Sequence, residues 1–255
     1  MDDTREPRPP RAGVSSSAGW GTHRTIRKIT LHEVSSHPAR IGACPHRVAF
    51  QPIVDVQTRV VVGYEALARF ADGRSPLTHL DEAREGGRLA AVEIDLIRSA
   101  VRAARALPAD LLVTVNASAD TLESEEFVGL LPPERPWGVE LTELSDVHER
   151  EGRLRDRTDT LEVSLLLDDM GSARTESEWI VAMRPDIVKI AKEIVWAACD
   201  DRAARTQLED FVAWARLIDA RVLAEGIETA VHDDLLVEAG IELAQGFRHG
   251  RPAFV

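Results

Sequence analysis

Acids, amides and one lysine stand at the ends of short apolar runs along this sequence. Asp168 and Asp169 follow a run of three leucines, and Lys189 follows an Ile-Val pair. Five further residues hold the same kind of position: Glu65, Asn116, Glu140, Glu225 and Gln245. A carboxylate buried alone costs several kcal/mol and would shift its pKa or require a partner. Acids that converge at one place therefore need cations to compensate their charge.

Divalent metal ions are the simplest source of that positive charge. Lys189 is the only cation at these positions, and a set of oxygen ligands favours Mg²⁺, Mn²⁺ or Ca²⁺ over zinc. Two ions bridged by Asp168 would clamp a phosphodiester, lower the pKa of a bridging water and stabilise the departing alkoxide. The bound ions would also let an acidic protein hold an anion.

Each of these residues, taken singly, also has a structural explanation. Asp and Glu are common at solvated strand ends and helix N-caps, and this is the more frequent origin of any one of them. Asn116 could form a turn with Ser118, and Lys189 could simply pair with one acid. The charged stretches 123–126 and 148–157 are interpreted as solvated helix faces. The eight histidines contain no HExxH pattern or closely spaced pair, so none is assigned to a metal.

The elements that must position the strand-end residues alternate between short β-type runs and longer stretches with helical spacing. Repeated strand-then-helix order predicts a mostly parallel sheet, and eight strands in about 200 residues favour a closed (β/α)8 barrel over an open doubly wound sheet. The 55–59 link is too short for a helical crossover, so the first two strands must be antiparallel. The predicted strands are Arg47–Val54, Val60–Leu67, Leu111–Asn116, Gly138–Leu141, Val163–Asp168, Ile187–Ile190, Arg221–Ala224 and Leu243–Gly246.

Composition bounds the remaining possibilities. The 255 residues are 44% hydrophobic and 29% charged, which is typical of a globular protein. A net charge of −12 and a single tyrosine disfavour a nucleic-acid polymer as partner. The absence of a signal-like or 18-residue apolar segment predicts a soluble protein without a membrane partner. Cys44 and Cys199 form no CxxC pair, which indicates a cytoplasmic location, and both are treated as small hydrophobes.

Three regions are expected along the chain. Residues 1–24 are rich in Pro, Ser, Gly and Arg and are expected to form a flexible leader. Residues 25–46 have no clean apolar period and are left undecided between a short helix and an ordered lead-in. Residues 47–255 form the predicted barrel domain.

Eight motifs in a fixed order give the sequence a family likeness. They are Gln51-Pro52-Ile53, Tyr64-Glu65-Ala66-Leu67-Ala68-Arg69, Val115-Asn116-Ala117-Ser118, Glu140-Leu141-Thr142-Glu143, Asp168-Asp169-Met170-Gly171, Pro185-Asp186-Ile187-Val188-Lys189-Ile190, Ala224-Glu225-Gly226-Ile227-Glu228-Thr229 and Gln245-Gly246-Phe247. Over about 49–252 the sequence resembles an EAL domain, the family of cyclic di-GMP phosphodiesterases. The resemblance implies a modified TIM barrel that hydrolyses cyclic di-GMP to linear pGpG with two Mg²⁺ or Mn²⁺ ions, and implies inhibition by Ca²⁺.

The resemblance also implies a role for each matched residue. One metal would be held by Glu65, Asn116, Glu140 and Asp168, and the second by Asp168, Asp169 and Glu225. Catalytic roles near the attacking water would belong to Lys189, which orients or deprotonates it, and to Glu225 and Gln245. Contacts to the dinucleotide would come from Gln51, Leu67 and Arg69, and support of the loops from Glu143 and Glu228. A homodimer is expected, with Trp179 and Met183 as apolar contacts near the loop after Asp169.

The sequence departs from the family pattern in the loop after Asp169 and again after Lys189. Active members commonly read Asp-Asp-Phe-Gly-Thr-Gly-Tyr-Ser where this chain has Met170, Ala173 and Arg174, and an Asp where it has Ala191. A metal-dependent phosphodiesterase is the leading hypothesis, because the implied ligands and Lys189 are retained. The alternatives are a cyclic di-GMP receptor with little or no hydrolysis and a protein-interaction module.

Overall fold

The computed structural model describes residues 39–41, 44–141, 147, 149–170 and 181–255, which lie in one compact unit, residues 31–255. The strands are β1 (Ala39–Ile41), β2 (Cys44–Asp55), β3 (Val61–Phe70), β4 (Leu112–Ala117), β5 (Trp137–Leu141), β6 (Ser164–Met170), β7 (Ile187–Ile190), β8 (Arg221–Ala224) and β9 (Leu243–Gln245). The helices are α1 (Pro76–Glu85), α2 (Leu89–Ala104), α3 (Ala119–Glu123), the 3₁₀ helix η1 (Glu125–Phe127), α4 (Glu151–Leu161), α6 (Lys192–Asp200), α7 (Arg202–Leu217) and α8 (Ala230–Ala239). None of these helices combines the length and apolar character that a membrane span requires.

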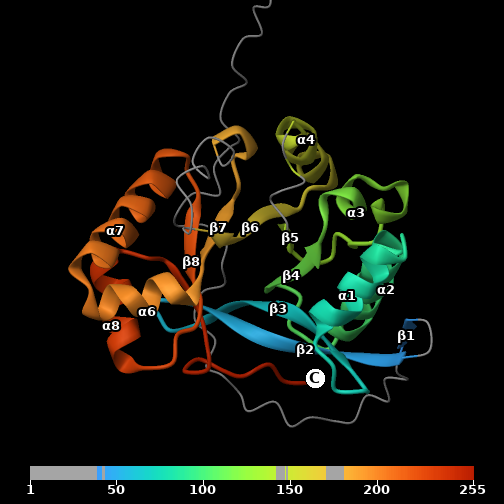
Figure 1. Cartoon of the computed structure of the whole chain (residues 1–255), viewed down its shortest axis with the longest axis horizontal. Helices are drawn as coiled ribbons and strands as arrows, with labels where there is room; N and C mark the ends of the chain where they lie inside the picture. The colour runs from blue at the N-terminus through green and yellow to red at the C-terminus, as the bar shows by residue number, and fades with distance from the viewer. Residues whose placement is uncertain (1–38, 42–43, 142–146, 148, 171–180) are drawn as a thin grey trace, which may run out of the picture. The chain divides into compact units, whose positions relative to one another are not determined.

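Strands β2 to β9 close into a barrel with helices packed around it (Figure 1). Each strand pairs with the next in sequence order, and β2 pairs with β9 to complete the circle. β2 runs antiparallel to both β3 and β9, whereas the pairs from β3 to β9 are parallel. The predicted α/β barrel with an antiparallel first pair is confirmed, because a five-residue link leaves no room for the crossover of a parallel pair.

The predicted strands are all present, with small shifts at their ends. β7 and β8 begin and end where the sequence predicted. β2 starts at Cys44 rather than Arg47, and β3 continues to Phe70 rather than Leu67. β1 pairs antiparallel with β2, so part of the undecided segment 25–46 is a strand. The three-region division of the chain stays a prediction.

Six apolar side chains fill the inside of the barrel and form a buried cluster of their own: Ile53, Leu112, Leu166, Ile187, Leu223 and Leu243. At this level β3 and β5 carry Gly63 and Gly138. A Cβ at Gly138 would lie 2.6 Å from Leu166 Cδ1, so a glycine there leaves the space that the leucine occupies. Side chains alternate between the two faces of a strand, so residues an even number of positions further along also point inward.

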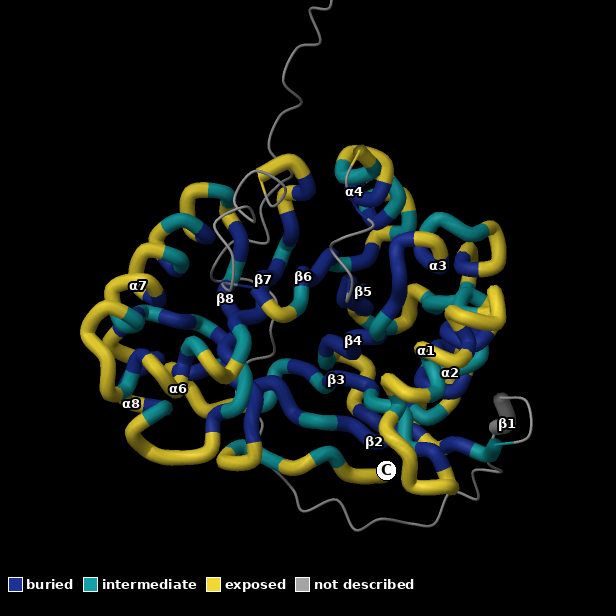
Figure 2. Tube along the Cα trace, in the orientation of Figure 1, coloured by how far each residue is buried: buried dark blue, intermediate teal, exposed yellow. Residues whose placement is uncertain are grey.

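A larger apolar cluster packs the outer faces of the strands against the helices. In Figure 2 the strands are mostly buried, and the surrounding helices alternate between buried and exposed residues. α2 contributes Ile94 and Ile97, and α7 contributes Leu208 and Val212, all of them buried. Their helical spacing puts each pair on one face. The barrel is therefore packed on both sides of its wall and gives a rigid base for the residues at its rim.

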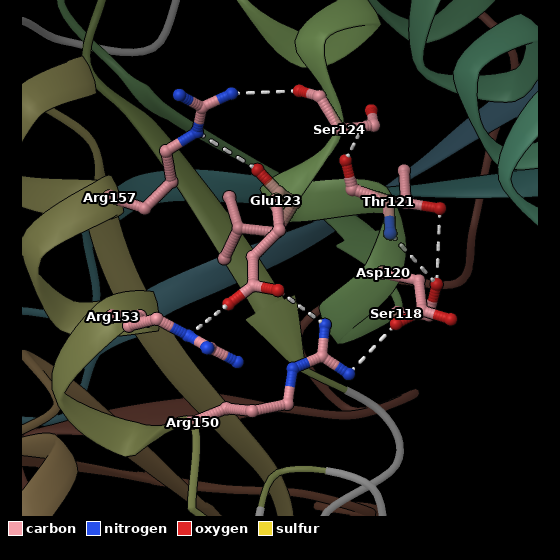
Figure 3. A network of polar contacts seen from close by, with 9 residues as sticks. Ser118, Asp120, Thr121, Glu123, Ser124, Arg150, Arg153 and Arg157 are labelled. Atoms are coloured by element: carbon pink, nitrogen blue, oxygen red, sulfur yellow. Dashed lines mark hydrogen bonds and ion pairs between the residues drawn. The ribbon is translucent and has the colours of Figure 1, made fainter.

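Arginines in α4 and at its N-cap hold that helix against α3 (Figure 3). Arg150, which precedes α4, lies 2.8 Å from Asp120 and 2.7 Å from Glu123. Arg157 donates to backbone carbonyls at the end of α3, including that of Ser124 at 2.7 Å. The predicted solvated face of 123–126 and 148–157 is therefore wrong for Arg150 and Glu123, whose side chains are 18% and 28% exposed. Arg153, at 69% exposed, fits the prediction.

Asp233 of α8 is a buried acid surrounded by basic groups. Its carboxylate faces Arg59 at 2.5 Å, His249 at 3.1 Å and the guanidinium of Arg248. Asp233→Asn removes the negative charge and leaves the two arginines beside each other. Because both are about 40% exposed, water screens part of their repulsion. We expect the free energy of unfolding to fall by about 2 kcal/mol in urea denaturation.

The neighbouring acid provides the control for this prediction. Asp234 is exposed, so Asp234→Asn should change the free energy of unfolding by less than about 0.5 kcal/mol. Equal effects of the two substitutions would contradict a role for the buried charge.

Candidate active site at the carboxyl ends of the barrel strands

The predicted polar residues reach one end of the barrel because each lies an even number of positions beyond the inner apolar layer. This spacing puts one inward-pointing side chain from each of seven strands at the same rim. The residues are Glu65, Asn116, Glu140, Asp168, Lys189, Glu225 and Gln245. The prediction that they converge is supported by the contacts between them.

Lys189 is the centre of this group. Its Nζ lies 2.7 Å from Glu140 Oε2, 2.7 Å from Glu225 Oε1 and 2.9 Å from Asp168 Oδ1. The lysine is 1% exposed and Glu140 is fully buried, whereas the Asp168 and Glu225 side chains are 18% and 24% exposed. One ammonium group thus joins strands β5, β6, β7 and the end of β8, and the two less buried acids mark the side open to solvent.

Glu65 is bound by two amide side chains on the opposite side of the rim. Gln245 Nε2 donates to Glu65 Oε2 at 2.6 Å, and Asn116 Nδ2 donates to Glu65 Oε1 at 3.3 Å. Neutral donors orient a carboxylate without cancelling its charge. Glu65 therefore remains available as a ligand for a cation.

A bulge in β6 brings two adjacent aspartates to the site. Adjacent residues of a regular strand point to opposite faces, so a regular β6 would turn one of them away. Asp169 has a left-handed φ of 53°, and the register with β7 shifts between Leu167 and Met170. Ligand oxygens of Asp168, Asp169 and Glu225 lie within 4.8 Å of one another. The backbone is therefore distorted where the acids meet, as bulges beside active sites often are.

The acids outnumber the positive charge available to them. Burial, then the charge of Glu65, raises the pKa of Glu140 to about 8, although Lys189 opposes this shift. Burial also raises the pKa of Glu225 to about 7, again against Lys189. Burial alone would lower the pKa of Lys189, but the surrounding carboxylates outweigh it and raise that pKa well above its ordinary value. The lysine therefore stays charged, and its single positive charge does not compensate all of the surrounding carboxylates.

These residues fit a site for divalent cations. Glu140 Oε1 and Gln245 Oε1 are buried oxygens that have no hydrogen-bond partner among the described residues. Asp168, Asp169 and Glu225 already present clustered oxygens, and the excess of acids leaves negative charge to be neutralised. An all-oxygen ligand set of this kind suits Mg²⁺ or Mn²⁺ better than softer metals.

The raised pKa values predict how the stability of the metal-free protein depends on pH. Between pH 6.5 and 8.5 the folded protein holds protons on Glu225 and Glu140 that the unfolded chain, with Glu pKa values near 4.3, has lost. The free energy of unfolding therefore falls as pH rises through this range. We expect the thermal unfolding temperature to fall from pH 6.5 to 8.5, and MnCl₂ to raise it more at pH 8.5 than at pH 6.5.

The matched control for this prediction is Glu140→Gln, which cannot ionise and should reduce the slope. Burial lowers the pKa values of His46 and His249, so the unfolded chain, whose histidines titrate near pH 6.5, opposes this slope at the lower end of the range, and the fall is measured most clearly above about pH 7.5. An unfolding temperature that rises across the range in the metal-free protein would contradict the assignment.

The predicted substrate contacts lie on one face of the β2–β3 ladder. Gln51 is directly opposite Glu65, and Leu67 and Arg69 follow Glu65 at two-residue intervals on the same face. All three are half-buried. Gln51 donates to the carbonyl of Gly250 at 3.3 Å, and Arg69 Nη1 donates to its neighbour's carbonyl at 2.7 Å. A row of side chains therefore leads from the acids at the rim to the guanidinium group of Arg69. A guanidinium group at this place could bind an anion.

Some predicted residues are not part of this arrangement. Glu143, Trp179, Ala173 and Arg174 lie outside the described residues. Glu228 is exposed, and its backbone N–H donates to His232 Nδ1 at 3.2 Å.

The two methionines singled out from the sequence are both fully buried. Met170 ends β6 and packs in the core. Met183, expected as an apolar contact between subunits, packs in the core as well, so the prediction that it offers a dimer surface is wrong.

Sequence reasoning missed the buried acid that positions the end of β4. Glu93 of α2 is 6% exposed, and its Oε2 accepts from the Ser118 hydroxyl at 2.7 Å and from the Ser118 N–H at 3.0 Å. Ser118 is two residues past Asn116, so this contact fixes the strand end that carries the amide. The one available signal was an acid four residues before Ile97, on the apolar side of a stretch with helical spacing.

Comparison with known proteins agrees with this geometry. Residues 39–252 match the family described as EAL domain. The chain is 24% identical over 261 residues to "Cyclic di-GMP phosphodiesterase PdeL" of Escherichia coli K12. The aligned part is 94% of this chain and 72% of that protein. It is 21% identical over 232 residues to "Probable cyclic di-GMP phosphodiesterase PdeD" of the same organism, covering 85% of this chain but only 44% of the relative.

A solved structure has the same fold. "Structure of EAL Enzyme Bd1971 - cAMP and cyclic-di-GMP bound form" superposes with a TM-score of 0.74 at 20% identity, covering 82% of this chain and 62% of that one. Three findings lead to one assignment. They are a barrel with one reversed strand, acids from successive strand ends around a buried lysine, and a family match over most of the chain. The chain belongs to the EAL domain family.

Proposed function

We propose that the protein is a metal-dependent phosphodiesterase that hydrolyses cyclic di-GMP to linear pGpG. The observation that carries the proposal is the convergence of Glu140, Asp168 and Glu225 on the buried ammonium of Lys189. An uncharged ligand would gain little from so many acids, whereas a phosphodiester bound through cations would use them all. The names of the curated relatives support the same substrate.

The acids and Asn116 would hold the two cations. Glu65, Asn116, Glu140 and Asp168 would hold one divalent cation, and Asp168, Asp169 and Glu225 the second. When bound, such a pair supplies Lewis-acid stabilisation of the phosphoryl oxygens and lowers the pKa of a bound water. Water adds to one phosphorus, the bond from that phosphorus to the 3′ oxygen breaks, and the product is a linear dinucleotide with one terminal phosphate and one free 3′ hydroxyl.

Lys189 would orient or deprotonate the attacking water. In the metal-free protein the surrounding carboxylates raise the pKa of Lys189, so Nζ is an ammonium that can donate to a water. The acids of β5, β6 and the end of β8 hold Nζ at a fixed place for this role. Gln245 of β9 reaches past β2 to keep Glu65 of β3 in position. Gln51, Leu67 and Arg69 would contact the dinucleotide, with Arg69 donating to phosphate.

The proposal is tested with the purified protein and cyclic di-GMP. Incubation with Mg²⁺ or Mn²⁺ should yield pGpG in chromatography, and a chelator should abolish the product. Ca²⁺ should inhibit. No turnover with either metal, while the protein is folded, would remove the enzyme assignment.

A receptor that binds cyclic di-GMP with little hydrolysis is the second candidate, and Ala191 favours it. Ala191 is the N-cap of α6, directly after β7, and makes no side-chain capping bond. The family's usual Asp would place a carboxylate two residues from Lys189. If its loss limits the enzyme, Ala191→Asp should raise turnover about tenfold, the size of effect typical of residues that support a metal site. Unchanged turnover would show that this position does not limit the reaction.

We further propose that the protein acts in the cytoplasm and forms a homodimer. The location is proposed because the two cysteines, Cys44 and Cys199, form no CxxC pair and no disulfide framework. The dimer is supported by the family resemblance alone, since Met183 is buried. Light scattering at high micromolar concentration should give twice the monomer mass, and a monomer would contradict this proposal.

A further inference from the structure

A second group of metal-ligating side chains lies at the end of the β2–β3 ribbon away from Glu65. Cys44, Asp72 and His79 each place a ligand atom within 4.8 Å of the other two. His79 Nε2 lies 3.1 Å from Asp72 Oδ2. We propose that these three side chains bind a borderline-soft divalent cation of the Zn²⁺ class, with water as the fourth ligand.

The strand register builds the first half of this site. β2 and β3 are antiparallel with His46 opposite Phe70, so two residues further on Cys44 lies across from Asp72. The backbone ladder continues past the end of β3, because Ala71 N donates to the strand opposite at 2.9 Å. The cysteine and the aspartate are therefore neighbours in space although they are far apart in the sequence.

The third ligand is held in place by an aromatic contact. His79 lies in the first turns of α1, and its ring stacks on Phe70 with centroids 3.8 Å apart and an angle of 22° between the planes. The imidazole is 11% exposed, and the partner carboxylate of Asp72 is 34% exposed. Arg74 N donates to Asp72 Oδ1 at 3.1 Å and orients that carboxylate. His79 and Asp72 are thus fixed in position. The site is open to water on the side of Asp72.

The ligand set selects the type of metal. One thiolate, one imidazole and one carboxylate suit Zn²⁺, whereas Mg²⁺ and Mn²⁺ prefer oxygen. Tetrahedral Zn²⁺ at 2.0–2.3 Å from its ligands needs ligand atoms roughly 3.3–3.8 Å apart. The three ligand atoms lie within 4.8 Å of one another, so side-chain movements of about 1 Å would bring them to this spacing. The site is also remote from the acids at the rim, since Asp72 lies beyond the end of β3 and Glu65 is five residues before that end. It would join the start of β2, the end of β3 and helix α1.

Cobalt is the probe, because a cobalt–thiolate bond has a charge-transfer absorption that oxygen ligands do not give. Metal-free, reduced full-length protein titrated with Co²⁺ should develop this band with one equivalent, and Zn²⁺ should remove it. Cys44→Ser should abolish the band, and the control Cys199→Ser should retain it. Metal at the rim contributes nothing to the band, so the result does not depend on the proposed phosphodiesterase activity.

Two more variants test the other ligands without relying on Cys44. Asp72→Asn and His79→Gln should each weaken Co²⁺ binding at least about tenfold, the lower bound for even an outer partner of a metal site. Circular dichroism checks that each variant is folded. Absence of the band in the native protein, its persistence in Cys44→Ser, or unchanged affinity in both Asp72→Asn and His79→Gln would overturn the proposal.

Discussion

Lys189→Met is expected to reduce the turnover of cyclic di-GMP by roughly 10³-fold, the scale expected when a group that orients or activates the attacking water is lost. Methionine keeps most of the side chain's length but removes the ammonium that Glu140, Asp168 and Glu225 share. The acids are then left without their protein cation, so the unfolding temperature should fall as well. Chromatography of pGpG and thermal unfolding measure the two effects.

The control for Lys189→Met is the same change at Lys192. Lys192 lies in the same region, but its side chain is 54% exposed and faces Glu193 at 3.8 Å. Lys192→Met should leave both turnover and unfolding temperature close to those of the native protein. Turnover by Lys189→Met within tenfold of the native rate would contradict the role given to this lysine.

Asp168→Asn is expected to lower turnover by more than about 100-fold and yet to stabilise the metal-free protein. Asp168 is the ligand that the two proposed cation sites share, and even the outer partners of metal ligands are worth 10–100-fold. At pH 8.5 Glu140 and Glu225 are ionised and still compensate Lys189, so asparagine there removes one surplus negative charge and lowers the mutual repulsion of the acids. Turnover should therefore fall and Mn²⁺ should bind more weakly, while the unfolding temperature without metal should rise.

A fall in turnover together with a rise in unfolding temperature distinguishes a metal ligand from a structural residue. A structural aspartate would lose stability and activity together when replaced. Asp156→Asn, on the exposed side of α4, is the matched control and should change neither. A fall in the unfolding temperature of metal-free Asp168→Asn would argue against the excess of negative charge.

The fold was largely predictable because short strands leave a strong pattern. The β-branched run before Lys189 gave the bounds of β7, and the short link after Asp55 gave the direction of β2. The site was predictable for a related reason. When apolar residues face a closed interior, a charged residue two positions later must face it as well, so Glu225 and Lys189 could be placed by counting.

The backbone distortion at Asp169 could not be predicted in this way. Two-residue alternation turns Asp168 and Asp169 to opposite faces, and nothing in an Asp-Asp pair shows that the strand bulges there. The cluster of Cys44, Asp72 and His79 was missed for a different reason. A search for closely spaced ligands finds only sites within one element, whereas these three are joined by the register of a long antiparallel ribbon.

The pairing of β2 with β9 has a consequence for how the chain reaches this structure. Ile53 lies opposite Gln245, so the seam of the barrel joins segments from near the two ends of the described chain. Contacts between such distant segments form late, because the loop that they close has a high entropic cost. Gln245 meets Glu65 only when that seam is made. A nascent or truncated chain that lacks β9 would therefore have an open edge and an incomplete rim, and activity should appear together with the last step of folding.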